Sequence, residues 1–127
     1  MSPVAGIGTD LCRIARFERL LEERMAVIDR LFTEGEKSYA LDKKFPAPHL
    51  AARFAAKEAF LKALGLGLRE GVSWQEMSVE RDPLGKPSLA LSGRALEIFE
   101  QRNYSSLHLS YSHDGDYAIA TVLLEVK

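Results

Sequence analysis

The apolar positions of the chain follow a helical period in two segments. Ile14, Phe17 and Leu21 fall on one face of a helix, while charged side chains occupy its other faces. Residues 49–64 are rich in Ala, Leu, Lys and Glu and stop before Gly65, a residue typical of helix C-termini. The pattern therefore predicts an amphipathic first helix and one long helix.

Two shorter helices are predicted from their start signals. Thr33, followed three residues later by Glu36, has the form of a capping box and opens a helix to about residue 43. Two prolines then break the chain before the long helix. A serine and a glycine at residues 92–93 predict another helix to about residue 103.

Shorter apolar segments predict five strands. The first covers residues 4–9 and carries two glycines. Residues 77–81 and 88–91 flank a turn-rich connection, and residues 107–112 and 117–126 flank another, so both pairs predict hairpins. Because helices interrupt these antiparallel strands, the predicted fold class is α+β.

Composition and charge narrow the class of protein. The chain has 127 residues, 46% of them hydrophobic and 28% charged, which predicts a single domain over residues 1–127. A formal net charge of −1 gives no excess of cations for wrapping a nucleic acid. The single Cys12 forms neither an internal disulfide nor a zinc cage, and no apolar run approaches a membrane span. We therefore expect a cytoplasmic protein that binds neither nucleic acid nor membrane.

One carboxylate lies on the apolar side of the long helix. Phe54, Glu58 and Leu61 stand at i, i+4 and i+7, so Glu58 is in line with residues that face the protein. A desolvated carboxylate needs a cation or hydrogen bonds. Lys57, Lys62 or a metal ion would supply the cation, and a plain Glu58–Lys62 ion pair is the structural alternative.

A second carboxylate directly follows the first predicted strand. Asp10 and Glu58 together would offer the two carboxylates that Mg²⁺ accepts beside water and phosphate oxygens. The structural alternative for Asp10 is the N-cap of the first helix. The sequence thus gives a candidate metal site, and purely structural roles for Asp10 and Glu58 remain open as alternatives.

Cations on the long helix and on one turn indicate an anionic ligand. Arg53 and Lys57 are i,i+4 neighbours whose like charges repel unless an anion lies between them. The turn Gly85-Lys86-Pro87 adds backbone N–H groups and another cation suited to a phosphate. A solvated basic face and an ordinary turn are the structural alternatives. The same surface would also suit a non-catalytic nucleotide-binding module.

Polar residues alternate along the strand predicted at 107–112. His108, Ser110 and Ser112 share one face, which is either a solvated sheet face or the wall of a polar site. This row motivates a rival hypothesis, a small acyl-thioester hydrolase. His113 falls on the opposite face from His108, so the two histidines do not share a zinc ion.

Five short motifs follow one another along nearly the whole chain. They are Gly6-Ile7-Gly8-Thr9-Asp10-Leu11, Phe32-Thr33 with Glu36, Arg53-Phe54-Ala55-Ala56-Lys57-Glu58-Ala59-Phe60 with Lys62-Ala63, Gly85-Lys86-Pro87, and His108-Leu109-Ser110-Tyr111-Ser112-His113. Their order and spacing resemble the holo-acyl-carrier-protein synthase family, the small 4′-phosphopantetheinyl transferases. The chain departs from that family at Cys12 and Arg13, where many relatives carry a small apolar residue and then an acid.

The resemblance implies a fold, an assembly and a set of partners. The fold would be an antiparallel sheet packed around a long central helix, and the assembly a homotrimer with active sites at subunit interfaces. Coenzyme A would be the donor substrate, an apo acyl carrier protein the acceptor, and Mg²⁺, or Mn²⁺ in its place, the cofactor. Arg13, Arg16 and Arg19 on the outward face of the first helix would dock the acidic carrier protein.

The resemblance also implies roles for the site residues. Asp10 and Glu58 would hold the metal against the pyrophosphate of coenzyme A. A serine of the carrier protein would attack the β-phosphate, and adenosine 3′,5′-bisphosphate would leave. This transfer would be a step in fatty acid biosynthesis. Lys62, the third catalytic residue, would stabilise the charge of the transferred or leaving group. Glu58, directly or through a water, would accept the serine proton. The residues implied to contact coenzyme A are Arg53, Lys57, Lys62, Gly85, Lys86, Pro87 and His108.

Overall fold

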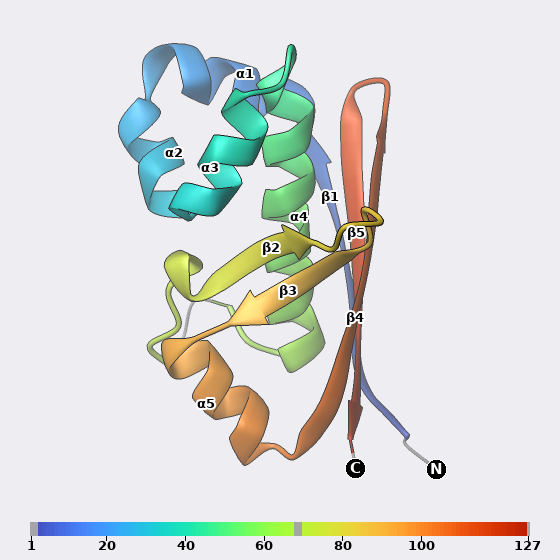
Figure 1. The fold of residues 1–127 in the computed structure, drawn as a ribbon. Coiled ribbons are helices and arrows are strands. Elements are labelled where there is room, and N and C mark those ends of the chain that lie inside the picture. Colours follow the sequence, from blue (N-terminus) through green and yellow to red (C-terminus); the bar gives the residue numbers. More distant parts are fainter. Residues whose placement is uncertain (1–2, 68–69, 127) are drawn as a thin grey trace.

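The computed structural model describes residues 3–67 and 70–126 and confirms the α+β class (Figure 1). In chain order the elements are β1 (Val4–Arg13), α1 (Ile14–Glu23), α2 (Met25–Leu31), α3 (Glu34–Leu41), α4 (Pro46–Leu64), the 3₁₀ turn η1 (Trp74–Glu76), β2 (Met77–Arg81), β3 (Pro87–Leu91), α5 (Gly93–Gln101), β4 (Tyr104–Asp114) and β5 (Tyr117–Val126). The sequence did not predict α2, because this short helix begins without a side-chain cap. None of the helices in the described ranges has the length and hydropathy that a membrane crossing requires.

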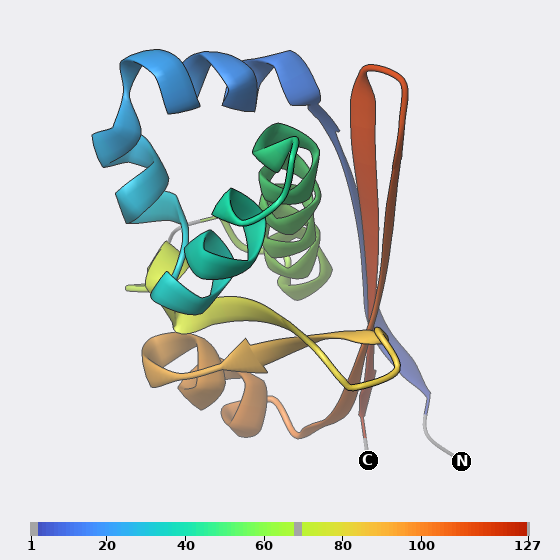
Figure 2. The same cartoon turned by 45° about the horizontal axis from the view of Figure 1, so that its top comes forward.

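The strands form two antiparallel sheets. β5 lies between β1 and β4 in a three-stranded sheet, and β2 pairs with β3 in a separate hairpin. α4 lies along one face of the larger sheet, with α1, α2 and α3 around its other sides and the β2–β3 hairpin beside it (Figures 1 and 2). The long helix is therefore central, as expected.

α4 begins earlier than the sequence predicted. Its first residue is Pro46, so Pro46 and Pro48 belong to its first turn and do not break the chain. A proline lacks the N–H group that the first turn leaves unpaired in any case, and its fixed φ suits a helix. Gly65 ends the helix with a φ of 77°, as expected.

Two glycines let β1 approach the backbone of α4. A Cβ atom on Gly8 would overlap the carbonyl oxygen of Ala59, and one on Gly6 would overlap that of Ala63. Only residues without a side chain fit at this distance. The close approach fixes the strand and the helix against each other, and with them the side chains that follow on each.

The other face of the three-stranded sheet is open in this chain. Ile7, Leu11 and Ile119 lie on it and are 63%, 59% and 41% exposed. Leu11 pairs with Ile119, and Leu123 pairs with both Ile7 and His108, so these side chains share a face. We call this surface the outer sheet face; it also carries Ser110 and Ser112.

Candidate active site

Two carboxylates from distant parts of the chain lie on the same side of α4. β1 continues past the predicted residues 4–9, so Asp10 lies within the strand, and the N-cap of α1 is Arg13. Lys62 Nζ donates to Asp10 Oδ1 at 2.9 Å and to the carbonyl oxygen of Thr9 at 3.1 Å. Glu58 lies one helical turn before Lys62, and the charge of Asp10 acts on its carboxyl. We call Asp10, Glu58 and Lys62 the acid cluster.

The carboxyl of Glu58 is less acidic than that of an ordinary glutamate. Burial is the first cause that raises the pKa of Glu58, and the negative charge of Asp10 adds to it. Lys62 and Arg16 lower the pKa in part. Among the described residues, Lys62 forms its ion pair with Asp10 and not with Glu58. Glu58 is therefore a partly desolvated carboxyl that favours a proton or a cation.

The acid cluster suits a hard divalent cation bound together with a phosphate. Its donors are carboxylate oxygens from two rigid elements, and Mg²⁺ characteristically fills its other positions with water and substrate oxygens. In residues 3–67 and 70–126 there is no group of three or more His, Cys, Asp or Glu side chains able to hold a metal. The donor set therefore fits Mg²⁺ and does not fit a closed zinc site.

The arginines expected on one face of the first helix are placed differently. Arg13 ends β1, and its Nη2 donates to Tyr117 Oη at 2.8 Å, so its placement on the helix was wrong. The guanidinium of Arg16 lies 4.9 Å from the centre of the Phe54 ring, and its charge lowers the pKa of the glutamate in the acid cluster. Arg19 is exposed on α1. Arg16 thus faces the candidate site and Arg19 faces solvent.

A second polar region lies on another side of α4. Arg53 is 1% exposed, its Nη1 donates to the carbonyl oxygen of His49 at 3.3 Å, and its Nε finds no partner among the described residues. It lines a cavity of about 390 Å³ between α3, α4, β2 and the turn containing Gly85. A buried guanidinium without a carboxylate is costly unless an anion joins it. We call this cavity the Arg53 pocket.

Three cations surround one tyrosine ring of the Arg53 pocket. The charged groups of Arg53, Lys43 and Arg81 lie 4.2, 4.4 and 5.6 Å from the centre of the Tyr39 ring. Arg81 Nη1 also donates to Tyr39 Oη at 3.0 Å. Burial, and then the charge of Arg53, lowers the pKa of His49 nearby. This concentration of positive charge favours an anionic ligand.

The Gly85-Lys86-Pro87 turn offers less than the sequence suggested. Gly85 lines the Arg53 pocket, as a nucleotide contact would require. However, Gly85 N donates to the carbonyl oxygen of Asp82 at 2.9 Å, and Lys86 N donates to Asp82 Oδ1 at 2.8 Å. These N–H groups are taken by the turn itself, so what remains for a ligand is the exposed Lys86 side chain and the surface of Gly85 and Pro87.

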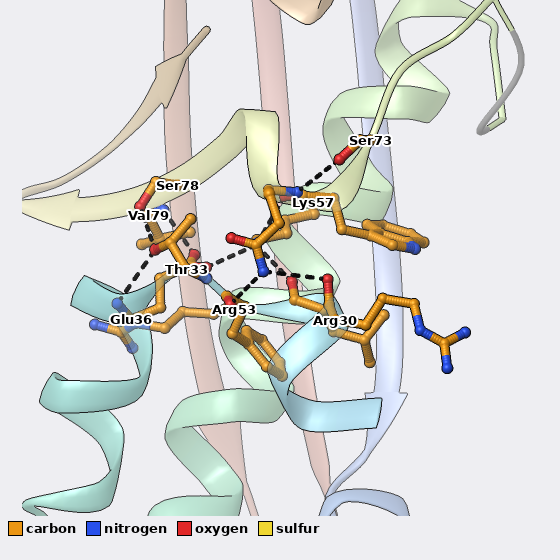
Figure 3. A network of polar contacts seen from close by, with 12 residues as sticks. Arg30, Thr33, Glu36, Arg53, Lys57, Ser73, Ser78 and Val79 are labelled. Carbon is orange, nitrogen blue, oxygen red and sulfur yellow. Dashed lines mark hydrogen bonds and ion pairs between the residues drawn. The ribbon is translucent and has the colours of Figure 1, made fainter. Parts of the chain in front are cut away.

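The structure corrects the expected contact between Lys57 and coenzyme A. The side chain of Lys57 is fully buried, and its Nζ lies 2.6 Å from Glu36 Oε1 (Figure 3). It also donates to the carbonyl oxygens of Leu31 at 2.7 Å and Trp74 at 3.2 Å. All three N–H donors of the ammonium are thus occupied within the protein. The i,i+4 spacing with Arg53 did not reveal that α3 and β2 cover this position.

His108 lies on the outer sheet face, so within one chain it reaches neither the acid cluster nor the Arg53 pocket. Its Nε2 lies 2.7 Å from Glu125 Oε1 and 3.5 Å from Ser106 Oγ. Glu125 and Ser106 both contact Nε2. In a Ser-His-acid triad the serine and the carboxylate contact different nitrogens of the imidazole. The row that motivated a hydrolase therefore shows no nucleophile activated through the imidazole.

The acid cluster and the Arg53 pocket face different sides of α4. Arg53 and Glu58 are separated by roughly 140° of rotation around a helix of 3.6 residues per turn. Glu58 faces β1, and Arg53 faces α3 and β2. A larger cavity, of about 560 Å³, lies between α1, the start of α4 and the β4–β5 turn, and none of the predicted site residues lines it.

Comparison with known proteins relates this chain to a family. Residues 6–122 match the family model of the 4′-phosphopantetheinyl transferase superfamily. A protein of Syntrophotalea carbinolica named holo-[acyl-carrier-protein] synthase is 60% identical over 126 residues, which cover 98% of each chain.

Solved structures with the same fold carry the same name. The crystal structure of holo-[acyl-carrier-protein] synthase from Neisseria meningitidis has a TM-score of 0.87 and 34% identity, and covers 96% of this chain and 98% of that chain. A holo-(acyl-carrier-protein) synthase from Bacillus anthracis, in complex with CoA (3′,5′-ADP), has a TM-score of 0.82 and 34% identity and covers 100% of both chains.

Proposed function

Because this chain belongs to the 4′-phosphopantetheinyl transferase superfamily and is a transferase, we propose that it acts as a holo-[acyl-carrier-protein] synthase. It transfers 4′-phosphopantetheine from coenzyme A to a serine of an apo acyl carrier protein in fatty acid biosynthesis. The complex of the Bacillus anthracis protein with CoA (3′,5′-ADP) supports coenzyme A as the donor. The observation that carries the proposal is the ion pair of Asp10 with Lys62, one helical turn after Glu58 on α4.

The acid cluster performs the transfer. Asp10 and Glu58 would hold Mg²⁺, which when bound would neutralise charge on the pyrophosphate of the donor. The serine oxygen forms a bond to the β-phosphorus, and the bond from that phosphorus to the oxygen bridging the two phosphates breaks. Lys62 lies beside Asp10 and stabilises the negative charge that develops on the leaving adenosine 3′,5′-bisphosphate.

Glu58 takes the proton of the serine, directly or through a water molecule. Without metal, burial and the charge of Asp10 raise the pKa of Glu58, whereas a bound cation would make this carboxylate a weaker base, which favours the route through a water molecule. The charge of Arg16 lies near the same carboxyl and lowers that pKa in part. Arg16 and the exposed Arg19 are the cations that remain on α1 for docking an acidic carrier protein.

The Arg53 pocket binds the nucleotide end of coenzyme A. Within the described residues nothing accepts a hydrogen bond from the buried Arg53 Nε, and three cations surround Tyr39 there, so a phosphate of the donor would complete the charge balance. The pocket and the acid cluster face different sides of α4. We therefore infer that the acid cluster of one chain works with the Arg53 pocket of a neighbouring chain.

A homotrimer would bring these two regions together. The outer sheet face exposes Ile7, Leu11 and Ile119, apolar side chains that association would remove from water. His108 lies on that same face, so its contact with coenzyme A would come from a neighbouring chain. The trimer, like the cytoplasmic location expected from the single Cys12, stays a prediction.

Intact-mass analysis of an apo acyl carrier protein tests the proposed function. Incubation with this protein, Mg²⁺ and coenzyme A should add one phosphopantetheine group to the carrier, and EDTA should prevent the addition. A hydrolase would instead release free thiol from an acyl thioester without metal. A nucleotide-binding module would bind coenzyme A and leave the mass of the carrier unchanged. Either result in place of the mass gain would contradict the proposal.

A further inference from the structure

A buried ion pair joins the elements that form the Arg53 pocket. Lys57 Nζ lies 2.6 Å from Glu36 Oε1, and both side chains are 0% exposed. Lys57 also donates to the carbonyl oxygens of Leu31, at the end of α2, and of Trp74, in η1. The ammonium thus ties α4 to α2, to α3 and to the segment that leads into β2. We call these two residues the Glu36–Lys57 pair.

The carboxylate extends these contacts to β2 (Figure 3). Glu36 Oε2 accepts a hydrogen bond from Val79 N at 2.8 Å, and Glu36 Oε1 accepts another from Thr33 N at 2.9 Å. Beside them, Thr33 Oγ1 lies 2.9 Å from Ser78 Oγ. The charged atoms of the pair therefore all have partners, and removing one charge would leave the other buried and uncompensated.

The walls of the Arg53 pocket come from the same three elements. α3 contributes Gly35 and Tyr39, β2 contributes Ser78 and Val79, and α4 contributes Arg53. Each wall is next to the Glu36–Lys57 pair: Gly35 precedes the glutamate, Val79 donates to it, and Arg53 lies one helical turn before the lysine. A shift at the pair would therefore change the separation of the walls.

We propose that the Glu36–Lys57 pair is a positioning device that holds the Arg53 pocket at the width required by the nucleotide of coenzyme A. The inference rests on the proposed function, because it takes coenzyme A as the ligand. Both residues act through the pocket walls and touch no ligand themselves. Two apolar side chains of similar volume often stabilise a fold at least as well as a buried ion pair, so stability alone does not require these charges. The hydrogen bonds of the pair, by contrast, specify where α2, α3, η1 and β2 lie around α4.

The double variant Glu36→Leu/Lys57→Met tests this role. It removes both charges together and leaves no buried ion alone. We expect the KM for coenzyme A and the Kd for adenosine 3′,5′-bisphosphate to rise about tenfold, with kcat within about twofold of wild type. A purely structural role would not give this split, because partial unfolding lowers the active fraction and hence the apparent kcat without changing KM.

Lys37→Met is the matched control. Lys37 also lies on α3 and forms ion pairs with Asp29 at 3.0 Å and Glu34 at 2.7 Å, but it does not line the pocket. Its KM and kcat should equal those of wild type. Unchanged KM and Kd in the folded double variant would overturn the positioning role.

A milder variant decides the question if the double variant does not fold. Thr33→Val keeps the shape of the side chain and removes the hydroxyl that contacts Ser78 Oγ and accepts a hydrogen bond from Glu36 N at the start of α3. A rise of KM and Kd of about twofold to threefold supports the proposal, and no rise contradicts it. If wild-type protein transfers no phosphopantetheine, the proposed function fails, while the Kd for adenosine 3′,5′-bisphosphate still tests the positioning role.

Discussion

The acid cluster and the Arg53 pocket differ in what holds their charges in place. Asp10, Glu58 and Lys62 are partly open to solvent and lie on two elements whose backbones touch at Gly8. Arg53 is 1% exposed, and walls from three elements surround it. Backbone contact thus positions the first region, and a buried side-chain network positions the second.

This difference separates chemistry from binding. Damage to the contact between β1 and α4 moves the two carboxylates and should lower kcat. Damage to the Arg53 pocket weakens the hold on the donor and should raise KM. Variants of the two regions are therefore expected to give opposite kinetic signatures on the same small domain.

The largest effect is expected from removing a carboxylate of the acid cluster. Asp10→Ala and Glu58→Gln should each lower kcat at least about 100-fold, because a metal ion contributes several kcal/mol to the transition state. Binding of adenosine 3′,5′-bisphosphate, measured by calorimetry, should stay within about twofold of wild type. Glu23→Gln, on the exposed end of α1, is the control. Near-normal kcat in either variant would show that the substituted carboxylate is not required for the transfer.

The next largest effect is expected at the contact between β1 and α4. In Gly8→Ala the new Cβ would overlap the Ala59 carbonyl oxygen, so the strand must move away from the helix and carry Asp10 with it. We expect kcat to fall at least about tenfold and the free energy of unfolding to fall by about 1–3 kcal/mol. Gly67→Ala, where a Cβ meets nothing within 4 Å, should change neither quantity. Wild-type kcat in folded Gly8→Ala would show that the close approach does not position the site.

Arg53→Met should give the opposite kinetic signature. Loss of a charged hydrogen-bond donor to a phosphate should raise the KM for coenzyme A about tenfold and leave kcat within about twofold of wild type. The melting temperature should not fall, because an apolar side chain replaces a buried charge whose Nε has no partner in the described part of the chain. Arg30→Met, at an exposed position of α2, is the control for a simple loss of charge. A selective fall in kcat would place Arg53 with the acid cluster instead.

The smallest effect concerns the stability contributed by Glu58 in the absence of metal. Its folded-state pKa is raised mainly by burial, so the folded protein binds the proton more tightly than the unfolded chain does. The contribution of Glu58 to stability is therefore present at acidic pH and is lost as the pH rises through the raised pKa. With EDTA present, Glu58→Gln should melt at a higher temperature than wild type near pH 7 and at the same temperature below about pH 4. A lower melting temperature for the variant near pH 7 would contradict the claim that burial makes the ionised Glu58 carboxylate unfavourable in the folded protein.

The sequence predicted the acid cluster better than it predicted the Arg53 pocket. Periodicity placed Glu58 on the face of its helix that meets the protein, and the resemblance grouped it with Asp10 and Lys62. Tyr39 and Arg81 were missed because α3 and β2 bring them to Arg53 from distant parts of the chain, with no shared motif.

Errors in the prediction arose where burial depends on packing between elements. Lys57 looked like an exposed cation, yet the covering of α4 by α3 and β2 makes it part of a buried ion pair. Arg13 looked helical because the length of β1 is set by its pairing with β5, which alternation along one segment does not reveal. Alternation did predict the row containing His108, but it could not show which face of the sheet meets α4.

Mixing two damaged chains is the most direct test of a site divided between subunits. Glu58→Gln lacks a working acid cluster, and Arg53→Met lacks a working pocket, so assemblies formed from both can combine the intact acid cluster of one chain with the intact pocket of its neighbour. At coenzyme A concentrations well below KM, the mixture should transfer phosphopantetheine several-fold faster than the mean of the two parents. A control mixture of Glu58→Gln with Asp10→Ala should show no gain, because both chains are damaged in the same region. A rate for the Glu58→Gln and Arg53→Met mixture no higher than the mean of its two parents would contradict a site shared between chains.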